Sequence, residues 1–255
     1  MTKRIVVVGG TGLIGSRLIK ILGESGIEAV AAAPNTGVNT LTGEGLAEVL
    51  RNSSVVVDVS NSPSFEEKPV MEFFQTSTRN LLSYEDKAGI RHHVALSVVG
   101  TDRLQESPYM RAKLAQEKLI REFGIPYSIV HATQFFEFVM AIADTMTDRN
   151  QVHVPPVFIQ PIAATDVAKA VGKIAVGIPV NGIVEVAGPQ RFRFDEFIRQ
   201  GLRARSDPRE VLVDPNARYF GAKLDELTLV ASGEARVGEI HFEDWLSPGN
   251  ARKIA

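Results

Sequence analysis

Residues 4–18 read RIVVVGGTGLIGSRL, and this stretch decides the fold of the chain. Its apolar run, residues 5–8, is typical of a buried strand and stops abruptly at glycine. Apolar residues then recur with helical spacing, at Leu13, Ile14, Leu18, Ile19 and Leu22. The pattern therefore predicts a strand, a tight turn and a helix in direct succession.

Three glycines, Gly9, Gly12 and Gly15, stand in this turn at the spacing of a dinucleotide-binding fingerprint. Gly9 permits the sharp turn after the strand, and Gly15 lets the helix lie close to the strand. Gly12 has no β-carbon, so a diphosphate can approach the main chain where the helix N-terminus offers free N–H groups. The alternative is a glycine-rich turn in some other α/β protein, but the strand–turn–helix context favours a nucleotide.

The composition sets limits on the class of protein. The chain has 255 residues, 44% hydrophobic and 23% charged, with a formal net charge of −2. No basic excess points to a nucleic-acid partner. The chain contains no cysteine, which excludes disulfides, thiolate metal sites and cysteine nucleophiles. Because no apolar run is long enough to span a bilayer and no signal peptide is evident, we expect a cytoplasmic protein without a membrane partner.

Strands and helices alternate over the first 150 residues, which predicts an α/β fold with a Rossmann-type, doubly wound parallel sheet. After the helix at residues 13–24, which Gly26 is expected to cap, strands are predicted at residues 27–33, 55–60, 94–99 and 126–132. Helices are predicted at residues 43–50, 65–88 and 107–123, and from residue 133 onward. A parallel crossover needs a dozen residues or more, so any strand directly after residue 37 is expected to be vestigial.

The regular alternation of strands and helices ends after residue 150. Extended pieces are expected within residues 152–160, a helix at 165–176, a strand at 183–187 and a helix at 194–202, followed by a short irregular remainder. We therefore expect residues 1–150 to form the nucleotide-binding Rossmann domain. Residues 151–255 are expected to complete the sheet and to form a small C-terminal lobe on the substrate side.

A second group of residues suggests acid–base chemistry. Tyr109 and Lys113 are four residues apart on a predicted helix, so their side chains share one face. Ser97 ends a predicted strand, which places its hydroxyl at the ligand-binding edge of the sheet. A nearby ammonium favours ionisation of a phenol, so Tyr109 is a candidate proton donor and acceptor, with Ser97 bonded to the same substrate oxygen. The alternative is a chance Tyr–Lys pair in which Lys113 is solvated.

The order of these motifs resembles the short-chain dehydrogenase/reductases, and more narrowly their atypical NmrA-like branch. The resemblance extends from Thr2 to about Ala187. It rests on GGTGLIG at residues 9–15, VDVS at 57–60, LSV at 96–98, YMRAK at 109–113 and AATDVA at 163–168. It implies a Rossmann domain that binds NAD or NADP and, usually, the reduction or oxidation of a carbonyl or alcohol.

Within this resemblance Lys113 carries over best, with a role in holding the ribose hydroxyls of the cofactor. Tyr109 lies only twelve residues after Ser97, whereas typical members separate the two by about two dozen, and NmrA-like members often keep only the lysine. The catalytic assignment is Tyr109, Lys113 and Ser97. The residues assigned to the cofactor are Gly9, Thr11, Gly12, Leu13, Ile14, Gly15, Pro34, Asn35, Thr36, Ser60, Asn61, Ser62, Ser97, Lys113, His131 and Ala132.

Other polar and aromatic residues have plainer interpretations. Asp58, inside a buried strand, is expected to be structural, and His92 and His93 are expected at the surface. His131 ends a strand at the ligand edge and is a candidate contact to cofactor or substrate. Glu137 either faces solvent or closes a pocket. No cluster of His, Asp or Glu has metal spacing, so no metal is predicted. Aromatic and aliphatic residues at 135–140 are expected mainly in the core, with one or two in an apolar substrate pocket.

The end of the second strand bears on the choice of cofactor. NAD-specific sites usually carry an acid there, and NADP-specific sites an arginine. Residues 32–36 contain neither, although Asn35, Thr36 and the main chain offer neutral donors for a phosphate. We therefore predict NADP as cofactor, with NAD as the alternative and a preference within about a hundredfold.

Three functions remain open. The first is an NAD(P)-dependent oxidoreductase acting on a small, apolar carbonyl or alcohol. The second is an NADP-responsive regulator without turnover, of the NmrA-like kind. A sugar-nucleotide epimerase or dehydratase ranks lower, because residues after 150 offer few clustered basic side chains for a sugar diphosphate. In each case we expect a monomer or homodimer.

Overall fold

A computed structural model describes residues 4–247 of the chain. Thr2, where the family resemblance begins, and residues 248–255 of the expected C-terminal part lie outside the described residues. A seven-stranded sheet runs in the order β12-β9-β5-β4-β3-β1-β2. Its pairs β1–β2, β1–β3, β3–β4 and β9–β12 are parallel, so the predicted α/β Rossmann fold is confirmed.

The strands of this sheet are β1 (Arg4–Val8), β2 (Glu28–Ala32), β3 (Val55–Asp58), β4 (His92–Val98), β5 (Tyr127–Ala132), β9 (Gly182–Ala187) and β12 (Arg236–Val237). Because β2 and β3 flank β1, the chain reverses its direction of travel across the sheet between them. Residues 33–54 contain only the 3₁₀ turn η1 (Pro34–Thr36) and the short helix α2 (Leu46–Val49). The prediction of a shortened second crossover is therefore confirmed.

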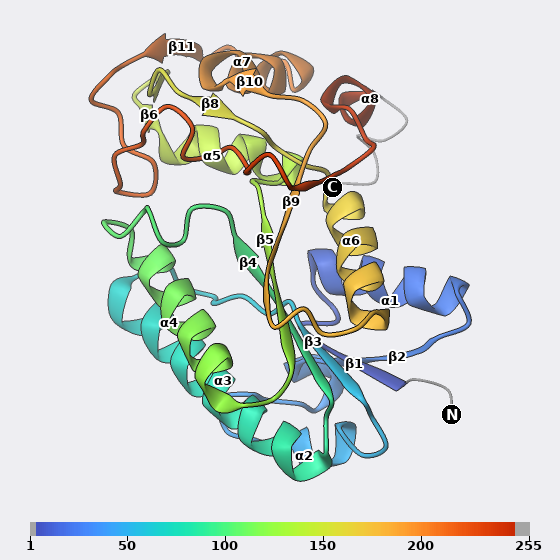
Figure 1. Ribbon diagram of the computed structural model, residues 1–255. Helices are drawn as coiled ribbons and strands as arrows, with labels where there is room; N and C mark the ends of the chain where they lie inside the picture. Colours follow the sequence, from blue (N-terminus) through green and yellow to red (C-terminus); the bar gives the residue numbers. More distant parts are fainter. Residues whose placement is uncertain (1–3, 248–255) are drawn as a thin grey trace. The chain divides into compact units, whose positions relative to one another are not determined.

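Helices cover both faces of the sheet (Figure 1). On one face lie α3 (Glu67–Ala88) and α4 (Pro108–Phe123), which meet through Val70, Phe74 and Ala112. On the other face lie α1 (Leu13–Glu24) and α6 (Ala164–Val176). Gly172 of α6 lies against Leu18 of α1, where a β-carbon on the glycine would meet the leucine at 3.3 Å.

The helices form where the sequence pattern places them. Helix α1 buries its apolar stripe, including Leu18 and Leu22, and ends before Gly26, whose φ of +71° confirms the predicted left-handed cap. Helix α3 ends at Gly89 with a φ of +70°. The strand β1 is buried on both faces, as expected for a central strand of a parallel sheet.

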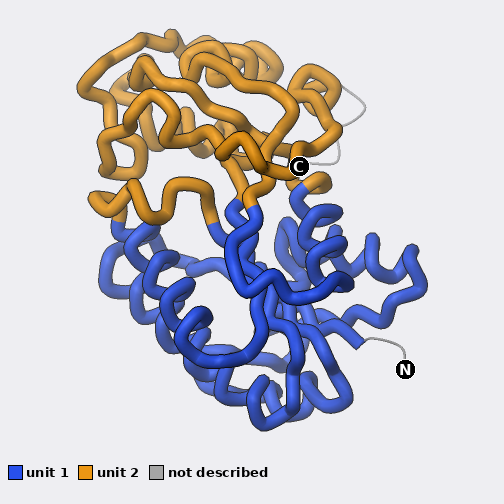
Figure 2. Tube along the Cα trace, viewed as in Figure 1, with its two compact units in different colours: residues 1–97, 108–131, 167–184 blue, residues 98–107, 132–166, 185–255 orange. Residues whose placement is uncertain are grey.

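The chain forms two compact units, which Figure 2 shows in different colours. The first comprises residues 1–97, 108–131 and 167–184, and the second comprises residues 98–107, 132–166 and 185–255. The units interleave along the sequence and do not divide at residue 150. The assignment of a cofactor role to one part of the chain and a substrate role to the other stays a prediction.

The second unit contains the remaining elements. They are η2 (Phe136–Phe138), α5 (Val139–Thr145), β6 (Thr147–Asp148), β7 (Gln151–Val154), β8 (Phe158–Ile159), β10 (Phe192–Arg193), α7 (Phe194–Ala204), β11 (Glu210–Val213) and α8 (Phe242–Leu246). The ring centroid of Phe242 lies within 6 Å of those of Phe136, Phe197 and Trp245. The remainder expected to be irregular therefore includes β11, β12 and α8, and its Trp245 belongs to an aromatic core.

Candidate cofactor and active site

The glycine turn has little space at two of its three glycines. Gly9 has a φ of +75°, and a β-carbon on it would lie 2.9 Å from the Cα of Ser60. A β-carbon on Gly15 would lie 2.3 Å from the carbonyl oxygen of Gly9, which is closer than real contacts allow. Strand β1, the turn and helix α1 are therefore held together without room for side chains at these positions, as the sequence predicted.

Gly12 differs from the other two. It is exposed and caps α1 with an extended backbone, and a β-carbon on it would meet only the oxygen of Gly9, at 3.3 Å. The first turn of α1, which includes Leu13 and Ile14, contains no acidic side chain. Its N–H groups have no helical partner and carry the positive end of the helix dipole. This turn fits an anionic diphosphate.

The end of β2 is connected to the glycine turn. Thr11 donates a hydrogen bond from Oγ1 to Oδ1 of Asn35, at 3.2 Å. The Thr36 hydroxyl accepts a hydrogen bond from the main-chain nitrogen of Ala33 at 2.9 Å, so it serves to close η1. Pro34, Asn35 and Thr36 are exposed. The main-chain nitrogens of Thr36 and Gly37 donate to Ala33 and Pro34 within the turn. The neutral donors expected for a phosphate are thus reduced to the side-chain amide and the main-chain N–H of Asn35.

The loop after β3 is organised by Asp58, which is only 3% exposed. Its Oδ1 accepts hydrogen bonds from the nitrogen and the hydroxyl of Ser60, at 2.9 and 2.6 Å. Its Oδ2 accepts a hydrogen bond from Nε2 of Gln116 at 3.0 Å. Ser62 is buried and Asn61 is exposed. Asp58 therefore has a structural role, because it fixes the loop at the carboxyl edge of the sheet.

Lys113 is buried, and its hydrogen bonds go to the protein interior. Its Nζ donates to the carbonyl oxygen of Leu96 at 2.8 Å and to Oε1 of Gln116, and it lies 4.5 Å from the ring centroid of Phe74. Burial lowers the pKa of Lys113 to about 8, although the negative charges of Asp58 and Glu117 oppose this shift. The alternative of a chance pair with a solvated Lys113 is therefore wrong as to the lysine.

Tyr109 lies half-buried among aromatic rings. Its ring centroid is 5.4 Å from that of Phe65 and 5.9 Å from that of Phe74. Burial raises the pKa of the Tyr109 phenol. This is opposite to the predicted direction, because the Lys113 ammonium that was expected to favour the phenolate is bonded to Leu96 and Gln116. The catalytic assignment of Tyr109 itself stays a prediction.

Ser97 belongs to a buried group centred on Glu117 of α4. Ser97 donates its hydroxyl proton to Oε1 of Glu117 at 2.6 Å, and Nε2 of His131 contacts the same oxygen at 2.8 Å. Arg121 donates to the other carboxylate oxygen at 2.5 Å. Burial alone raises the pKa of Glu117, but the hydrogen bonds and charges of these donors outweigh it and hold the pKa below the usual value. Glu117 is therefore an anion with three donors.

Gln116 and Glu117 were missed by the sequence analysis. Their positions three and four residues after Lys113 put all three side chains on one helical face. Three polar residues on the helix face that carries Tyr109 form a pattern from which Gln116 and Glu117 could have been predicted as site residues. Their burial, at 1% exposed each, reveals a polar seam between α4 and the strand ends.

His92 and His93 correct a second expectation, because both are buried. The ring of His92 contacts the Ser128 hydroxyl through Nε2 at 2.9 Å. The ring of His93 contacts both carboxylate oxygens of Glu85 through Nδ1, at 2.9 and 3.0 Å, and neither residue is exposed to solvent. The strand that carries them is internal to the sheet, so its first residues are covered by helix α3 and strand β5.

In the second unit, Ala132 is buried at the end of β5. Phe135 and Phe138 stack with centroids 5.5 Å apart, and Phe138 is 45% exposed. Glu137 accepts hydrogen bonds from the main-chain nitrogen of Ala164, at 3.0 and 3.2 Å, so it caps α6. Of the aromatic residues expected in a substrate pocket, this stacked pair is the part that reaches the surface.

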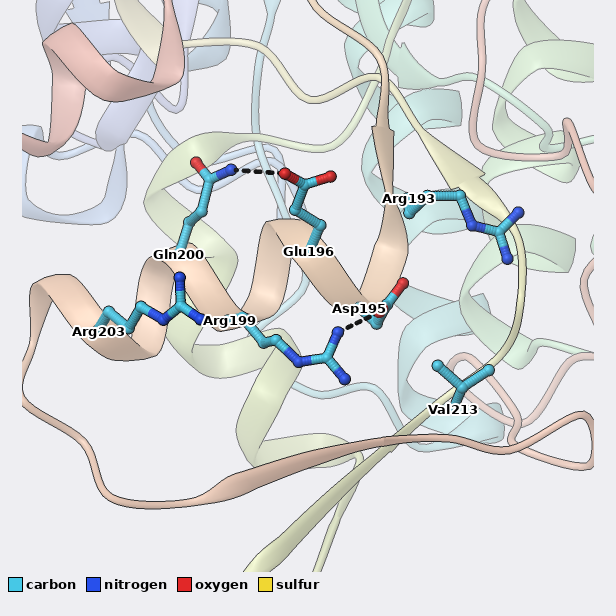
Figure 3. A pocket seen from close by; sticks show the side chains of 7 residues that line it. All are labelled: Arg193, Asp195, Glu196, Arg199, Gln200, Arg203 and Val213. Carbon is cyan, nitrogen blue, oxygen red and sulfur yellow. Dashed lines mark hydrogen bonds and ion pairs between the residues drawn. The ribbon is translucent and has the colours of Figure 1, made fainter.

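Two open hollows of the described residues lie away from most of the predicted site. One, of about 450 Å³, is lined by charged side chains of α7 and its neighbours (Figure 3), where Arg199 pairs with Asp195. Another, of about 1230 Å³, lies along β2 and α2 and shares only Thr36 with the residues predicted to bind the cofactor. The assignment of the site rests on its motifs and hydrogen bonds.

Within residues 4–247, no three His, Asp or Glu side chains gather as ligands for a metal ion. None of the described helices is both long and apolar enough to cross a membrane.

Comparisons with known structures agree with this fold. UDP-glucose 4-epimerase from Thermus thermophilus, solved with NAD, matches 95% of this chain and 96% of its own, with a TM-score of 0.71 and 19% identity. The dTDP-4-dehydrorhamnose reductase of Bacillus anthracis, solved with NADP, matches with a TM-score of 0.69 and 16% identity, covering 96% of this chain and 97% of its own. At such identities the likeness shows the Rossmann fold alone.

In sequence, the chain is similar to the photosystem II assembly factor Ycf39 of Synechocystis sp.. The two are 24% identical over 148 residues, which are 52% of this chain and 45% of the relative. The chain thus spans slightly less than half the length of this curated relative. No protein-family model matches the chain.

Proposed function

We propose that the chain binds a nicotinamide dinucleotide, preferably NADP, in its first unit. The observation that carries the proposal is the contrast within the glycine turn. Gly9 and Gly15 are closed by protein atoms, whereas Gly12 is open at the N-terminus of α1. The solved structures of the same fold contain NAD or NADP in their own sites, which supports this cofactor class.

The proposed contacts follow the carboxyl edge of the sheet. The glycine turn would hold the diphosphate, and Asn35 with its neighbours would hold the adenosine ribose. The loop at residues 60–62, which Asp58 orders, would lie beside the rest of the dinucleotide. When bound, the nicotinamide supplies hydride transfer.

We further infer that the protein is an oxidoreductase for a small carbonyl or alcohol. The half-exposed aromatic pair of Phe135 and Phe138 supports an apolar substrate. Tyr109 remains the predicted acid and base of this reaction. It would have to act without Lys113 and Ser97, because the donors of both are bonded to Leu96, Gln116 and Glu117.

A second candidate is a dinucleotide-binding protein that acts through a partner and not by turnover. The similarity to a photosystem II assembly factor over half of the chain favours it. The internal bonding of Ser97 and Lys113 also favours it, because it leaves the predicted catalytic set incomplete.

The test separates binding from turnover. NADPH and NADH are titrated by fluorescence of the reduced nicotinamide, with Gly12→Val as the matched variant that fills the diphosphate space. Absence of binding at millimolar concentration would refute the cofactor proposal.

A panel of carbonyls, including a sugar nucleotide, is then run with NADPH on wild type and Tyr109→Phe. Binding without turnover of any compound would favour the second candidate.

A further inference from the structure

The feature that the predicted chemistry does not use is the contact between His131 and Glu117. His131 is the next-to-last residue of β5, at the carboxyl edge of the sheet, and its side chain is 8% exposed. Its Nε2 lies 2.8 Å from Oε1 of Glu117, and the glutamate is 1% exposed. A carboxylate accepts hydrogen bonds only, so Nε2 carries the proton and Nδ1 carries a lone pair in the neutral ring.

The free ring nitrogen is what distinguishes this pair. Nδ1 of His131 makes no hydrogen bond to a described residue, yet it is not among the buried atoms that are sealed from water without a partner. The pair of His93 and Glu85 is the internal contrast. There Nε2 of His93 is sealed in the core, and both side chains are fully buried. His93 therefore cannot exchange a proton with a ligand, while His131 can.

Charged groups surround the carboxylate that holds His131. Arg121 donates to the second oxygen of Glu117, and the carboxylates of Glu117 and Asp58 both act on the buried ammonium of Lys113. Ser97 shares the Glu117 oxygen with His131, which places the ring beside the carboxyl end of β4.

We propose that His131 is the catalytic acid and base of this site and that Glu117 is its positioning residue. The assignment rests on the proposed oxidoreductase function and changes the group that moves the proton. In the oxidation direction the alcohol hydroxyl gives its proton to the Nδ1 lone pair of His131, and the carbon–hydrogen bond breaks with its electron pair passing to the oxidised nicotinamide. The carbonyl forms as the ring becomes an imidazolium. In reduction the same Nδ1–H returns the proton to the carbonyl oxygen.

This assignment accounts for two observations that the Tyr109 assignment leaves aside. The Tyr109 phenol has a raised pKa and stays protonated, whereas an imidazole exchanges protons near neutral pH. Glu117, an acceptor for Nε2–H, fixes the ring orientation and the tautomer as the carboxylate does in a catalytic triad.

The first test reads the ring directly and needs no substrate. Nitrogen-15 NMR of the five histidines, with His131 assigned by its loss in His131→Gln, reports the tautomer of the neutral ring. We expect the Nε2–H tautomer in wild type and a changed tautomer ratio in Glu117→Gln. The Nδ1–H tautomer in wild type, or an unchanged ratio in Glu117→Gln, would overturn the assignment.

The second test combines NADPH binding with turnover of an active panel carbonyl. His131→Gln, or His131→Asn should the first not fold, is expected to lose about a hundredfold or more in kcat, and to lose more in kcat than in NADPH affinity. Glu117→Gln should lose less and shift the pH profile. Retained kcat in His131→Gln, or a loss confined to NADPH affinity, would overturn the assignment alone. No NADPH binding to wild type would instead refute the proposed function, and this assignment with it.

Discussion

Gly15 lies so close to Gly9 that a β-carbon on it would come within 2.3 Å of the Gly9 carbonyl oxygen. The same construction at Gly12 gives 3.3 Å to that oxygen and no further contact within 4 Å. A side chain at position 15 would therefore collide with the backbone, whereas one at position 12 would meet a single tight contact. A ligand that approaches the main chain at Gly12 would supply a further reason for glycine there.

The two glycines should therefore respond differently to substitution. Gly15→Ala is expected to destabilise the protein by about 1–3 kcal/mol, because backbone atoms must move to admit the methyl group. Gly12→Ala should change the free energy of unfolding by less than about 1 kcal/mol but weaken NADPH binding at least tenfold. Urea unfolding and fluorescence titration measure the two effects. Equal loss of stability in both variants would show that Gly12 is also structural.

The buried pair of Glu85 and His93 should make stability depend on pH. Burial opposes the charge on His93, but the charge and hydrogen bonds of Glu85, with the charge of Asp58, outweigh it and raise the pKa of His93 above its ordinary 6.5. Its stabilisation is therefore complete below about pH 6.5 and is lost as the pH rises through the folded-state pKa. Burial also raises the pKa of Glu85, which adds to a fall in stability with rising pH.

Glu85→Gln tests this pair. Removing the buried carboxylate leaves the imidazolium without its partner, so the variant should be about 3 kcal/mol less stable than wild type at pH 6. The difference should shrink as the pH rises, because the wild type loses its ion pair. Urea unfolding at pH 6, 7 and 8 measures it, and a difference that grows with pH would contradict the expected sign.

The contribution of Lys113 to stability should depend on pH in the opposite direction. Burial lowers its pKa from 10.5 to about 8, so between these values the unfolded chain binds more protons than the folded one. Stability attributable to Lys113 therefore rises with pH from about 8 to 10.5. Lys113→Met removes this contribution, so the stability of wild type relative to the variant should increase over that range by at most about 3 kcal/mol. A constant difference would indicate a solvated lysine.

The sequence predicted the fold well because its signals are local. The apolar run at residues 5–8, the glycines after it and the helical spacing from Leu13 each depend on near neighbours, and the cap at Gly26 was predicted to the residue. The surroundings of Lys113 and His93 could not be predicted in this way. Their partners, Leu96, Gln116 and Glu85, come from other turns and elements, so burial and pairing depend on how α3 and α4 meet the strands.

The C-terminal part was less predictable for a related reason. Strands β8, β10 and β12 have only two residues each, too few for a periodic pattern. Helix α8 likewise is one short turn, and its place comes from Phe242 and Trp245 meeting rings of other elements. Contacts distant in the sequence, and not local propensity, determine these elements.

The last prediction concerns cofactor preference. Strand β2 ends at Ala32, and η1 follows with no carboxylate and no arginine at residues 33–36. Arg17, in the second turn of α1, donates to the carbonyl oxygen of Leu13 at 2.6 Å. Nothing at this turn repels a 2′-phosphate, and only neutral donors attract it. NADPH should therefore bind more tightly than NADH by a factor within about a hundredfold, or under about 3 kcal/mol.

The substitution Asn35→Asp tests the predicted preference for NADPH over NADH. The added carboxylate would stand at the exposed turn where NAD-specific sites place their acid, so it should repel the 2′-phosphate and accept the ribose hydroxyls of NADH. We expect NADPH affinity to fall at least tenfold while NADH affinity holds or rises. Asn35→Ser is the matched neutral control and should keep the wild-type order. Tighter binding of NADH than of NADPH by wild type, or an equal loss of both in Asn35→Asp, would mean that the ribose phosphate does not lie at this turn.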